Sequence, residues 1–208
     1  MDLWWQTTIP GLFACGECAG THGVARPGGT ALNAGQVGSL RAAQYICAKG
    51  KKASDAVSDI VFCKILQRAV QRHEEIGAAV LSRKDNVTEF IENAKRGMSD
   101  NGAAIRDPEK MGSALKNVCE RLDKMNDVTG VADKSSLYLY YKLKDILITQ
   151  AAVLTAMADY ADKIGSTRGS ALYTDPEGML RDGLEEVFRF NASDTEHTKH
   201  IQEIYLEE

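Results

Sequence analysis

The 208-residue chain lacks a long apolar run, an excess of positive charge and a secretion signal. No stretch approaches the roughly 18 consecutive apolar residues that a membrane-spanning helix needs. The net charge of −4 at pH 7 argues against nucleic acid or an anionic membrane as the main partner. Because no basic, apolar leader opens the sequence, we expect a cytoplasmic protein. Hydrophobic residues make up 44% and charged residues 26%, a composition typical of globular domains.

Cysteines are few, and their odd number predicts reduced thiols rather than a disulfide framework. The five are Cys15, Cys18, Cys47, Cys63 and Cys119. The Cys-x-x-Cys at residues 15–18 is open to a zinc or a redox interpretation, but no second cysteine pair supplies further zinc ligands. A thioredoxin-like pair opens a helix, whereas the glycines around this pair predict a loop. His197 and His200 are equally weak evidence for a metal, so no metal site is predicted.

Glycines recur through residues 9–35, which predict a short strand, a loop and the start of a helix. The apolar run at residues 12–15 is typical of a buried parallel strand. Glu17 follows at the carboxyl end of that strand, where ligands of open α/β sheets bind. Thr30 is the predicted N-cap of the helix, and the N–H groups of its first turn favour a negatively charged ligand.

The same residues resemble the last part of the FAD-binding domain of the succinate dehydrogenase, fumarate reductase and L-aspartate oxidase flavoproteins. That family carries Gly-Leu-Tyr-Ala-Ala-Gly-Glu, followed by His-Gly-Ala-Asn-Arg-Leu-Gly-Gly-Asn-Ser-Leu. This chain has Gly-Leu-Phe-Ala-Cys-Gly-Glu at residues 11–17 and His-Gly-Val-Ala-Arg-Pro-Gly-Gly-Thr-Ala-Leu at residues 22–32. Ala25 replaces the family's asparagine and Pro27 its leucine, so the resemblance leaves the substrate undefined.

The resemblance implies that five residues bind FAD. Glu17, preceded by Gly16, would bind a ribityl or ribose hydroxyl of the cofactor. The helix start at Thr30, Ala31 and Leu32 would bind the flavin ring. Its N–H groups would face the flavin C2 carbonyl, where negative charge gathers on reduction, and fixed donors aimed at a developing anion stabilise it.

Two further residues are implied to bind substrate. Arg26 would hold a substrate carboxylate, for which the planar guanidinium is well suited, and His22 would lie beside the same site. Without the family, each residue also has a structural interpretation. Glu17 could cap a turn, Arg26 could be a surface arginine, and His22 could be a structural histidine.

The family's first half has no counterpart in this sequence. The Gly-x-Gly-x-x-Gly motif that binds the FAD pyrophosphate is absent, as is the domain that caps the substrate. We therefore expect the C-terminal portion of a longer flavoprotein, inactive by itself. The remainder of the flavoprotein or another chain would complete the flavin site. The resemblance also allows an iron–sulfur partner subunit.

Helical periodicity predominates after the glycine-rich loop. We predict helices at about residues 30–49, 54–76, 88–97, 108–130 and 136–164. Asn86 or Thr88 is expected to cap the third helix and Gly97 to stop it. Asp107 is expected to cap the fourth, with Pro108 as its first residue. The last helix carries two apolar stripes, which predicts a position at the centre of a bundle.

The C-terminal residues predict a turn at residues 175–178 and a hairpin of two strands at residues 186–190 and 201–206. Arg168 and Gly169 resemble the family's Glu-Ser-Arg-Gly segment. The expected fold class is mainly α. A strand–loop–helix remnant of the FAD-binding domain spans residues 1–50, a helical bundle residues 51–175, and a tail with the hairpin residues 176–208.

Three functions are compatible with these patterns. The favoured one is part of an FAD-dependent oxidoreductase that transfers a hydride between flavin and a small carboxylate substrate. The second is a helical docking or oligomerisation module without catalytic activity. The third is a redox protein that uses Cys15 and Cys18. The sequence identifies neither the substrate nor the electron acceptor.

Overall fold

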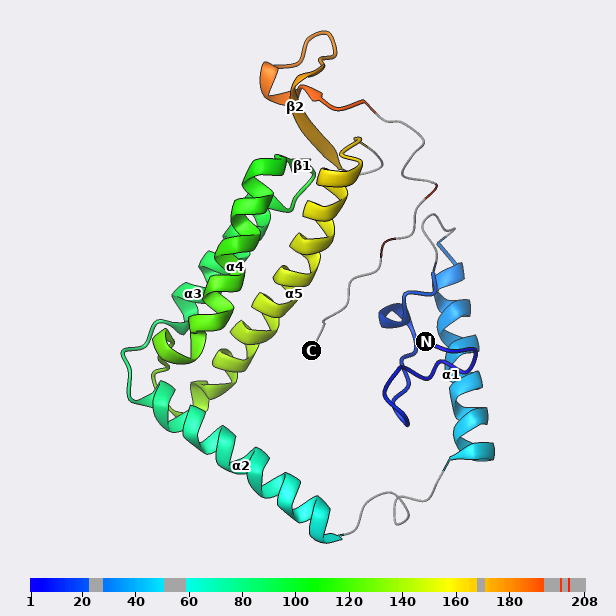
Figure 1. The fold of residues 1–208 in the computed structure, drawn as a ribbon, viewed down its shortest axis with the longest axis vertical. Helices are drawn as coiled ribbons and strands as arrows, with labels where there is room; N and C mark the ends of the chain where they lie inside the picture. The colour runs from blue at the N-terminus through cyan, green and yellow to red at the C-terminus, as the bar shows by residue number, and fades with distance from the viewer. Residues whose placement is uncertain (23–27, 51–58, 168–170, 193–198, 200–201, 203–208) are drawn as a thin grey trace. The chain divides into compact units, whose positions relative to one another are not determined.

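The computed structural model of the chain describes residues 1–22, 28–50, 59–167, 171–192, 199 and 202 (Figure 1). The chain divides into two compact units, Met1–Ala69 and Val70–Glu208. Most described residues lie in helices, so the expected mainly α fold is confirmed. The division into three domains stays a prediction.

The first unit contains a 3-10 helix, η1 (Glu17–Ala19), and the long helix α1 (Thr30–Lys49). The range predicted for α1 is confirmed, and Gly50 ends it by donating its N–H to Ile46 O at 2.8 Å. The prediction that Thr30 is the N-cap is wrong, because the N-cap is Gly29. The backbone at Gly29 is already close to helical, with φ −71° and ψ −18°, so Thr30 becomes the first helical residue.

The segment before the loop folds back on itself. Phe13 forms an antiparallel bridge with Gln6, and Thr7 N donates to Leu12 O at 2.8 Å. The prediction of a buried parallel strand at residues 12–15 is wrong, since Leu12 is 51% exposed. A buried parallel strand needs neighbours on both sides. In the described part of this unit, the backbone pairing of residues 12–14 is with residues 5–9, on one side.

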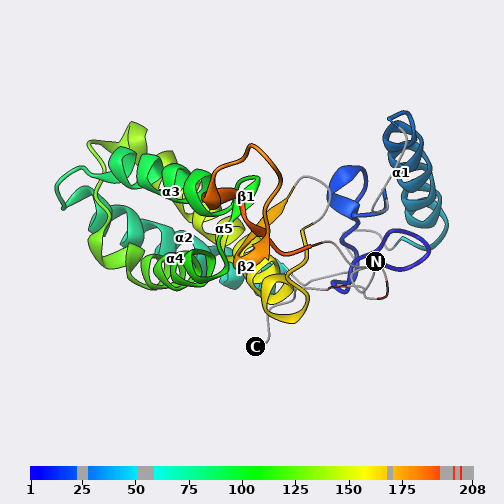
Figure 2. The same cartoon turned by 90° about the horizontal axis from the view of Figure 1, so that it is seen from above.

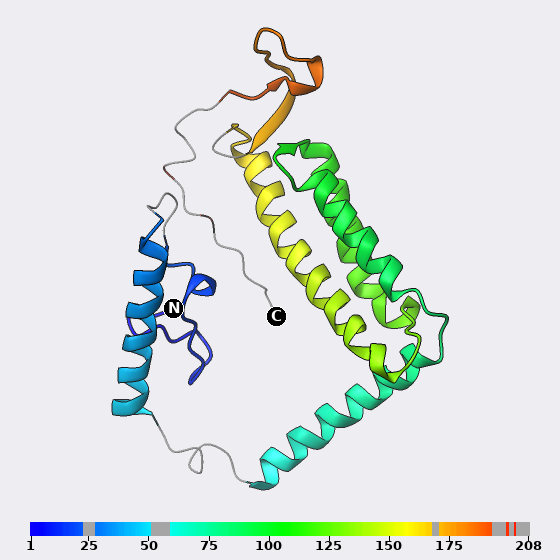
Figure 3. The same cartoon turned by 180° about the vertical axis from the view of Figure 1, so that it is seen from behind.

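Four helices dominate the rest of the described chain: α2 (Asp59–Leu81), α3 (Val87–Asn101), α4 (Pro108–Val128) and α5 (Leu137–Lys163). The start predicted for α2 lies outside the described residues. Figures 1 and 3 show α3, α4 and α5 side by side, with α5 packed against both others. The predicted central position of the last helix is thus confirmed. No helix in the described ranges has the length and apolarity to cross a membrane.

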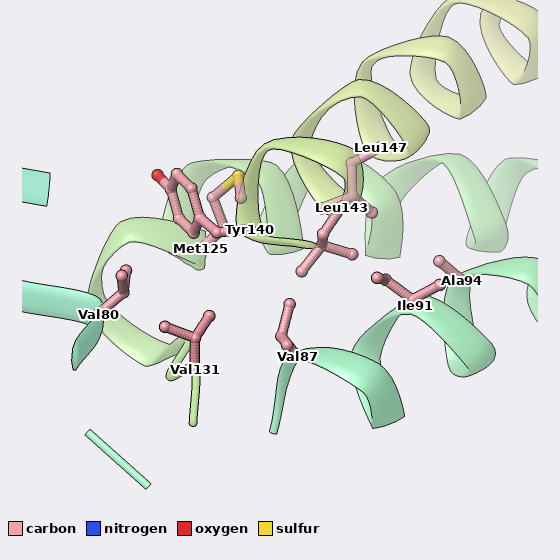
Figure 4. Close-up of a cluster of buried hydrophobic side chains, with 9 residues drawn as sticks. All are labelled: Val80, Val87, Ile91, Ala94, Met125, Val131, Tyr140, Leu143 and Leu147. Atoms are coloured by element: carbon pink, nitrogen blue, oxygen red, sulfur yellow. The ribbon is translucent and has the colours of Figure 1, made fainter. Parts of the chain in front are cut away.

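The bundle core lies where α5 meets α3 and α4 (Figure 4). It is formed by Val80, Val87, Ile91, Ala94, Met125, Val131, Tyr140, Leu143 and Leu147. Figure 4 shows the side chain of Leu143 directed toward Val87 and Ile91 of α3. Burying an aliphatic side chain of this size contributes about 1.5–3 kcal/mol, so these contacts fix the helices relative to one another.

Two short strands lie where α5 ends (Figures 1 and 2). Strand β1 (Ile105–Arg106) pairs in parallel with β2 (Leu172–Met179). Arg106 also donates from Nη1 to the Tyr173 hydroxyl at 2.9 Å and lies over its ring.

The C-terminal predictions are largely wrong where the structure describes these residues. Residues 175–178, predicted as a turn, belong to β2, although Asp175 Oδ1 still accepts the Glu177 N–H at 3.0 Å. Glu186–Phe188 is a 3-10 helix, η4, instead of a strand. Phe190 forms antiparallel bridges with Thr174 and Met179, which are both residues of β2. Within the described residues, β2 is therefore the pairing partner of Phe190. The second half of the predicted hairpin lies outside the described residues.

Candidate functional site

Two glycines with positive φ angles define the loop around Glu17. Gly16 has φ 83° and Gly20 has φ 65°, conformations that residues with a Cβ rarely adopt. Between them, η1 is a single turn that Gly20 closes by donating its N–H to Glu17 O at 3.0 Å. This geometry holds Glu17 at the start of η1, with its side chain exposed.

The loop packs on α1 through two glycines, Gly16 of the loop and Gly35 of the helix. A Cβ placed on Gly35 would lie 3.6 Å from Gly16 Cα, which is van der Waals contact. Gly35 lies little more than one turn from the start of α1 at Thr30. The fold therefore brings Gly16, the residue before Glu17, against the second turn of this helix.

The helix start is accessible. Thr30 and Leu32 are exposed, Ala31 is half-buried, and Gly29 provides no side-chain hydrogen bond to the first turn. The N-terminal N–H groups and the helix dipole make such an end favourable for an anion or an electron-rich carbonyl. In the part of the chain that the structure describes, the Glu17 carboxylate forms no ion pair.

Two residues that support this arrangement were missed by the sequence reasoning. The Trp5 indole lies against Gly38, where an added Cβ would be 2.5 Å from Trp5 Nε1. The Arg41 guanidinium lies 4.9 Å from the Trp4 ring centre and donates from Nε to Leu3 O at 2.8 Å. Gly35, Gly38 and Ala42 form a face of small residues on α1, which predicts that another element approaches closely. The pattern does not predict that this element carries a tryptophan.

The predicted substrate side of the site is only partly described. His22 is half-buried, and its Nε2 is buried without a hydrogen-bond partner among the described residues. Arg26 lies outside the described residues, as do Arg168, His197 and His200. The substrate roles of His22 and Arg26 therefore stay predictions.

The cysteine pair lies next to the same loop. Cys15 and Cys18 are free thiols, and Cys18 Sγ donates to Cys15 O at 3.2 Å. Within the described ranges, no group of three or more histidine, cysteine, aspartate or glutamate side chains could hold a metal ion.

Comparisons with known proteins match this chain to parts of two larger proteins. No model of a known protein family matches it. Over 161 residues it is 33% identical to an uncharacterised FAD-dependent oxidoreductase of Methanocaldococcus jannaschii, which covers 74% of this chain and 27% of that protein. Its fold is similar to that of FrdA in a variant of E. coli quinol fumarate reductase, with a TM-score of 0.59, 22% identity, and coverage of 87% of this chain and 31% of FrdA.

The chain thus spans less than a third of either protein's length. The sequence match and the shared fold together confirm the resemblance to the succinate dehydrogenase, fumarate reductase and L-aspartate oxidase flavoproteins that the glycine-rich motifs indicate.

Proposed function

We propose that this chain supplies one part of the flavin site of an FAD-dependent oxidoreductase of the fumarate reductase type. The observation that supports the proposal is the packing of Gly16, the residue before Glu17, against Gly35 in the second turn of α1. The similarity to an FAD-dependent oxidoreductase supports the same conclusion.

The residues present fit the cofactor. Glu17 is exposed at the start of η1, so its carboxylate can accept a hydrogen bond from a hydroxyl of the ribityl chain or ribose. Ala31 and Leu32, in the helix turn that Thr30 opens, would present their N–H groups to the flavin ring. Bound flavin supplies the hydride chemistry, and these donors stabilise negative charge on the ring.

The proposed substrate is a small carboxylate, bound by Arg26 with His22 beside it. A guanidinium binds a carboxylate through two parallel hydrogen bonds, and the buried Nε2 of His22, which has no partner among the described residues, is a second polar group for such a ligand. The reaction we propose is hydride transfer between flavin and this carboxylate.

The activity needs more than this chain. Because the chain spans 27% of its M. jannaschii relative, we propose that the remainder of the flavoprotein or another chain completes the flavin site. The isolated chain is then inactive. An iron–sulfur subunit is a further proposed partner, on the likeness to FrdA of quinol fumarate reductase. The proposed location is the cytoplasm, in keeping with five free cysteines.

The docking-module alternative has one observation in its favour. Ile60, Phe62 and Ile65 of α2 are 69%, 57% and 58% exposed, and exposed apolar patches mark interaction sites. This alternative stays a prediction. The described part of the glycine-rich loop forms backbone hydrogen bonds, such as Gly20 N–H to Glu17 O at 3.0 Å, that a docking module does not need.

The test is the visible absorption spectrum of the purified chain after incubation with FAD and desalting. We expect the wild-type chain to retain flavin absorbance and Glu17→Gln to retain less. Glu74→Gln, an exposed change on α2, is the control and should retain as much as wild type. A colourless wild-type chain would show that this loop and helix do not bind FAD by themselves.

A further inference from the structure

A pocket of about 380 Å³ lies in the second unit and is lined by side chains of α3, α4 and α5. Apolar side chains line part of it: Phe90 of α3, Met125 of α4, and Leu143 and Leu147 of α5. The volume falls within the range of about 300–1,000 Å³ that is usual for small-molecule sites. The pocket shares no residue with the glycine-rich loop, so it is a separate feature of the molecule.

Polar side chains line the remainder of the pocket. Asn117, Arg121 and Lys124 follow one another at helical spacing on one face of α4, and Asn93 lines the pocket from α3. Glu120 is the acidic residue among the lining side chains, so the two cations leave one positive charge in excess. The pocket is therefore apolar in part and cationic in part.

The two cations are available to a ligand. Among the residues that the structure describes, neither Arg121 nor Lys124 forms an ion pair. Thr129 also lines the pocket, is fully buried, and has an Oγ1 without a hydrogen-bond partner in the described part of the chain. A buried hydroxyl without a hydrogen-bond partner is unfavourable, so a ligand oxygen that reaches Oγ1 would supply the partner.

We infer that this pocket binds a small amphipathic carboxylate, with its apolar body against Phe90, Leu143 and Leu147 and its carboxylate at Arg121 and Lys124. The apolar body covers the half-buried ring of Phe90 and lies against Leu143 and Leu147, which are each 2% exposed. Charge-assisted hydrogen bonds hold the carboxylate. An inorganic anion leaves the apolar part unused, and a neutral amphiphile leaves the cations unused. This site goes beyond the proposed flavin chemistry and does not depend on it.

The test is a titration of the full chain, without flavin, with octanoate, followed by backbone amide NMR. We expect saturable shifts at residues 90–93, 117–129 and 143–147. Octanol and acetate, which each lack one of the two groups, should bind at least about tenfold more weakly. The double variant Arg121→Ala/Lys124→Ala should also lose about tenfold in octanoate affinity, since it removes both cations.

The control variant is Arg96→Ala/Lys116→Ala, which removes two exposed cations from α3 and α4 outside the pocket. It should bind octanoate like wild type. Equal affinity in the pocket variant, shifts confined to the exposed apolar residues of α2, or no saturable shift in a folded chain would each overturn the proposal. Far-UV circular dichroism confirms that each variant is folded.

Discussion

Gly130 shows how a single residue joins two helices of the bundle. Its N–H donates to Asn86 Oδ1 at 2.9 Å, and its carbonyl accepts the N–H groups of Asn86 and Val87 at 3.2 Å. A Cβ at this position would overlap the backbone carbonyl of Lys84. The loop after α4 can therefore approach the start of α3 only because residue 130 has no side chain.

We predict that Gly130→Ala destabilises the second unit by about 2–3 kcal/mol, because the backbone of residue 84 must move to relieve the overlap. Urea unfolding followed by far-UV circular dichroism measures the change. Gly112→Ala is the matched control, since a Cβ there meets nothing within 4 Å inside α4. It should stabilise the unit by about 0.5–1 kcal/mol through helix propensity. Equal effects of the two changes would contradict this account.

The carboxyl group of Asp133 makes the stability of the fold depend on pH. Hydrogen bonds from the Ser135 hydroxyl and then from the Ser136 hydroxyl and N–H hold the pKa of its carboxyl below the usual value of 3.8. A lowered pKa in the folded state means that the ionised carboxylate stabilises the fold above the unfolded-state pKa. This contribution disappears as the pH falls through the folded-state pKa.

Asp133→Asn removes this titration. We predict that the melting temperature of the variant lies below that of wild type at neutral pH. The two melting temperatures should converge as the pH falls below the usual aspartate value of 3.8. A difference that stays constant between neutral and acidic pH would mean that the ionised carboxylate does not cause it.

Helix α5 carries a buried and an exposed aliphatic residue at adjacent positions. Leu147 is 2% exposed, whereas the adjacent Ile148 is 46% exposed. We predict that Leu147→Ala costs about 2–5 kcal/mol of stability through lost burial and the cavity it leaves. Ile148→Ala should cost under about 1 kcal/mol. Chemical unfolding of both variants checks the pair, and similar costs would contradict the assignment of Leu147 to the buried face of α5 and Ile148 to its exposed face.

The sequence predicts elements well where local chemistry decides them. Asp107 caps α4 by accepting the N–H groups of Glu109 and Lys110, with Pro108 as the first helical residue, as predicted. Asn86 is the N-cap of α3, as predicted, but its side chain bonds Val128 O and Gly130 N instead of the first turn. Side-chain periodicity and these N-caps depend on residues close together in the sequence, so they can be predicted without knowledge of the fold.

The predictions fail where tertiary contacts decide the element. Gly97 does not stop α3, which continues to Asn101. A glycine inside a helix costs only about 1 kcal/mol, and the next residue, Met98, packs on the second core cluster of Met111, Met157, Ala171 and Tyr173. Strands β1 and β2 are not predicted from the sequence, because their pairing covers two residues of distant segments and leaves no periodic pattern.

The same distinction between local and tertiary signals applies to the candidate site. The family resemblance predicts that Glu17 and the start of α1 serve one cofactor, and the described structure adds the contact between Gly16 and Gly35 of α1. The resemblance could not predict that Trp5 and Arg41 support α1, because those contacts depend on how residues 1–14 fold.

At the scale of the whole molecule, the chain corresponds to a minor part of its relatives: 27% of the M. jannaschii oxidoreductase and 31% of FrdA. A flavin site assembled from several chain segments distributes its contacts among them. We therefore expect this part to bind FAD more weakly than a complete flavoprotein does. The contribution of Glu17 should still be measurable, because the loop and α1 pack together within one unit.

The most direct test of the proposed flavin role uses the two tryptophans of the chain, Trp4 and Trp5, which both pack near α1. Flavin bound near them quenches their fluorescence by energy transfer, so a titration with FAD reports binding to the first unit. We predict saturable quenching that Glu17→Gln weakens about tenfold, as expected for one lost hydrogen bond to a charged group, and that Glu74→Gln leaves unchanged. Identical curves for wild type and Glu17→Gln, or no saturable quenching in wild type, would contradict the proposed role of this loop.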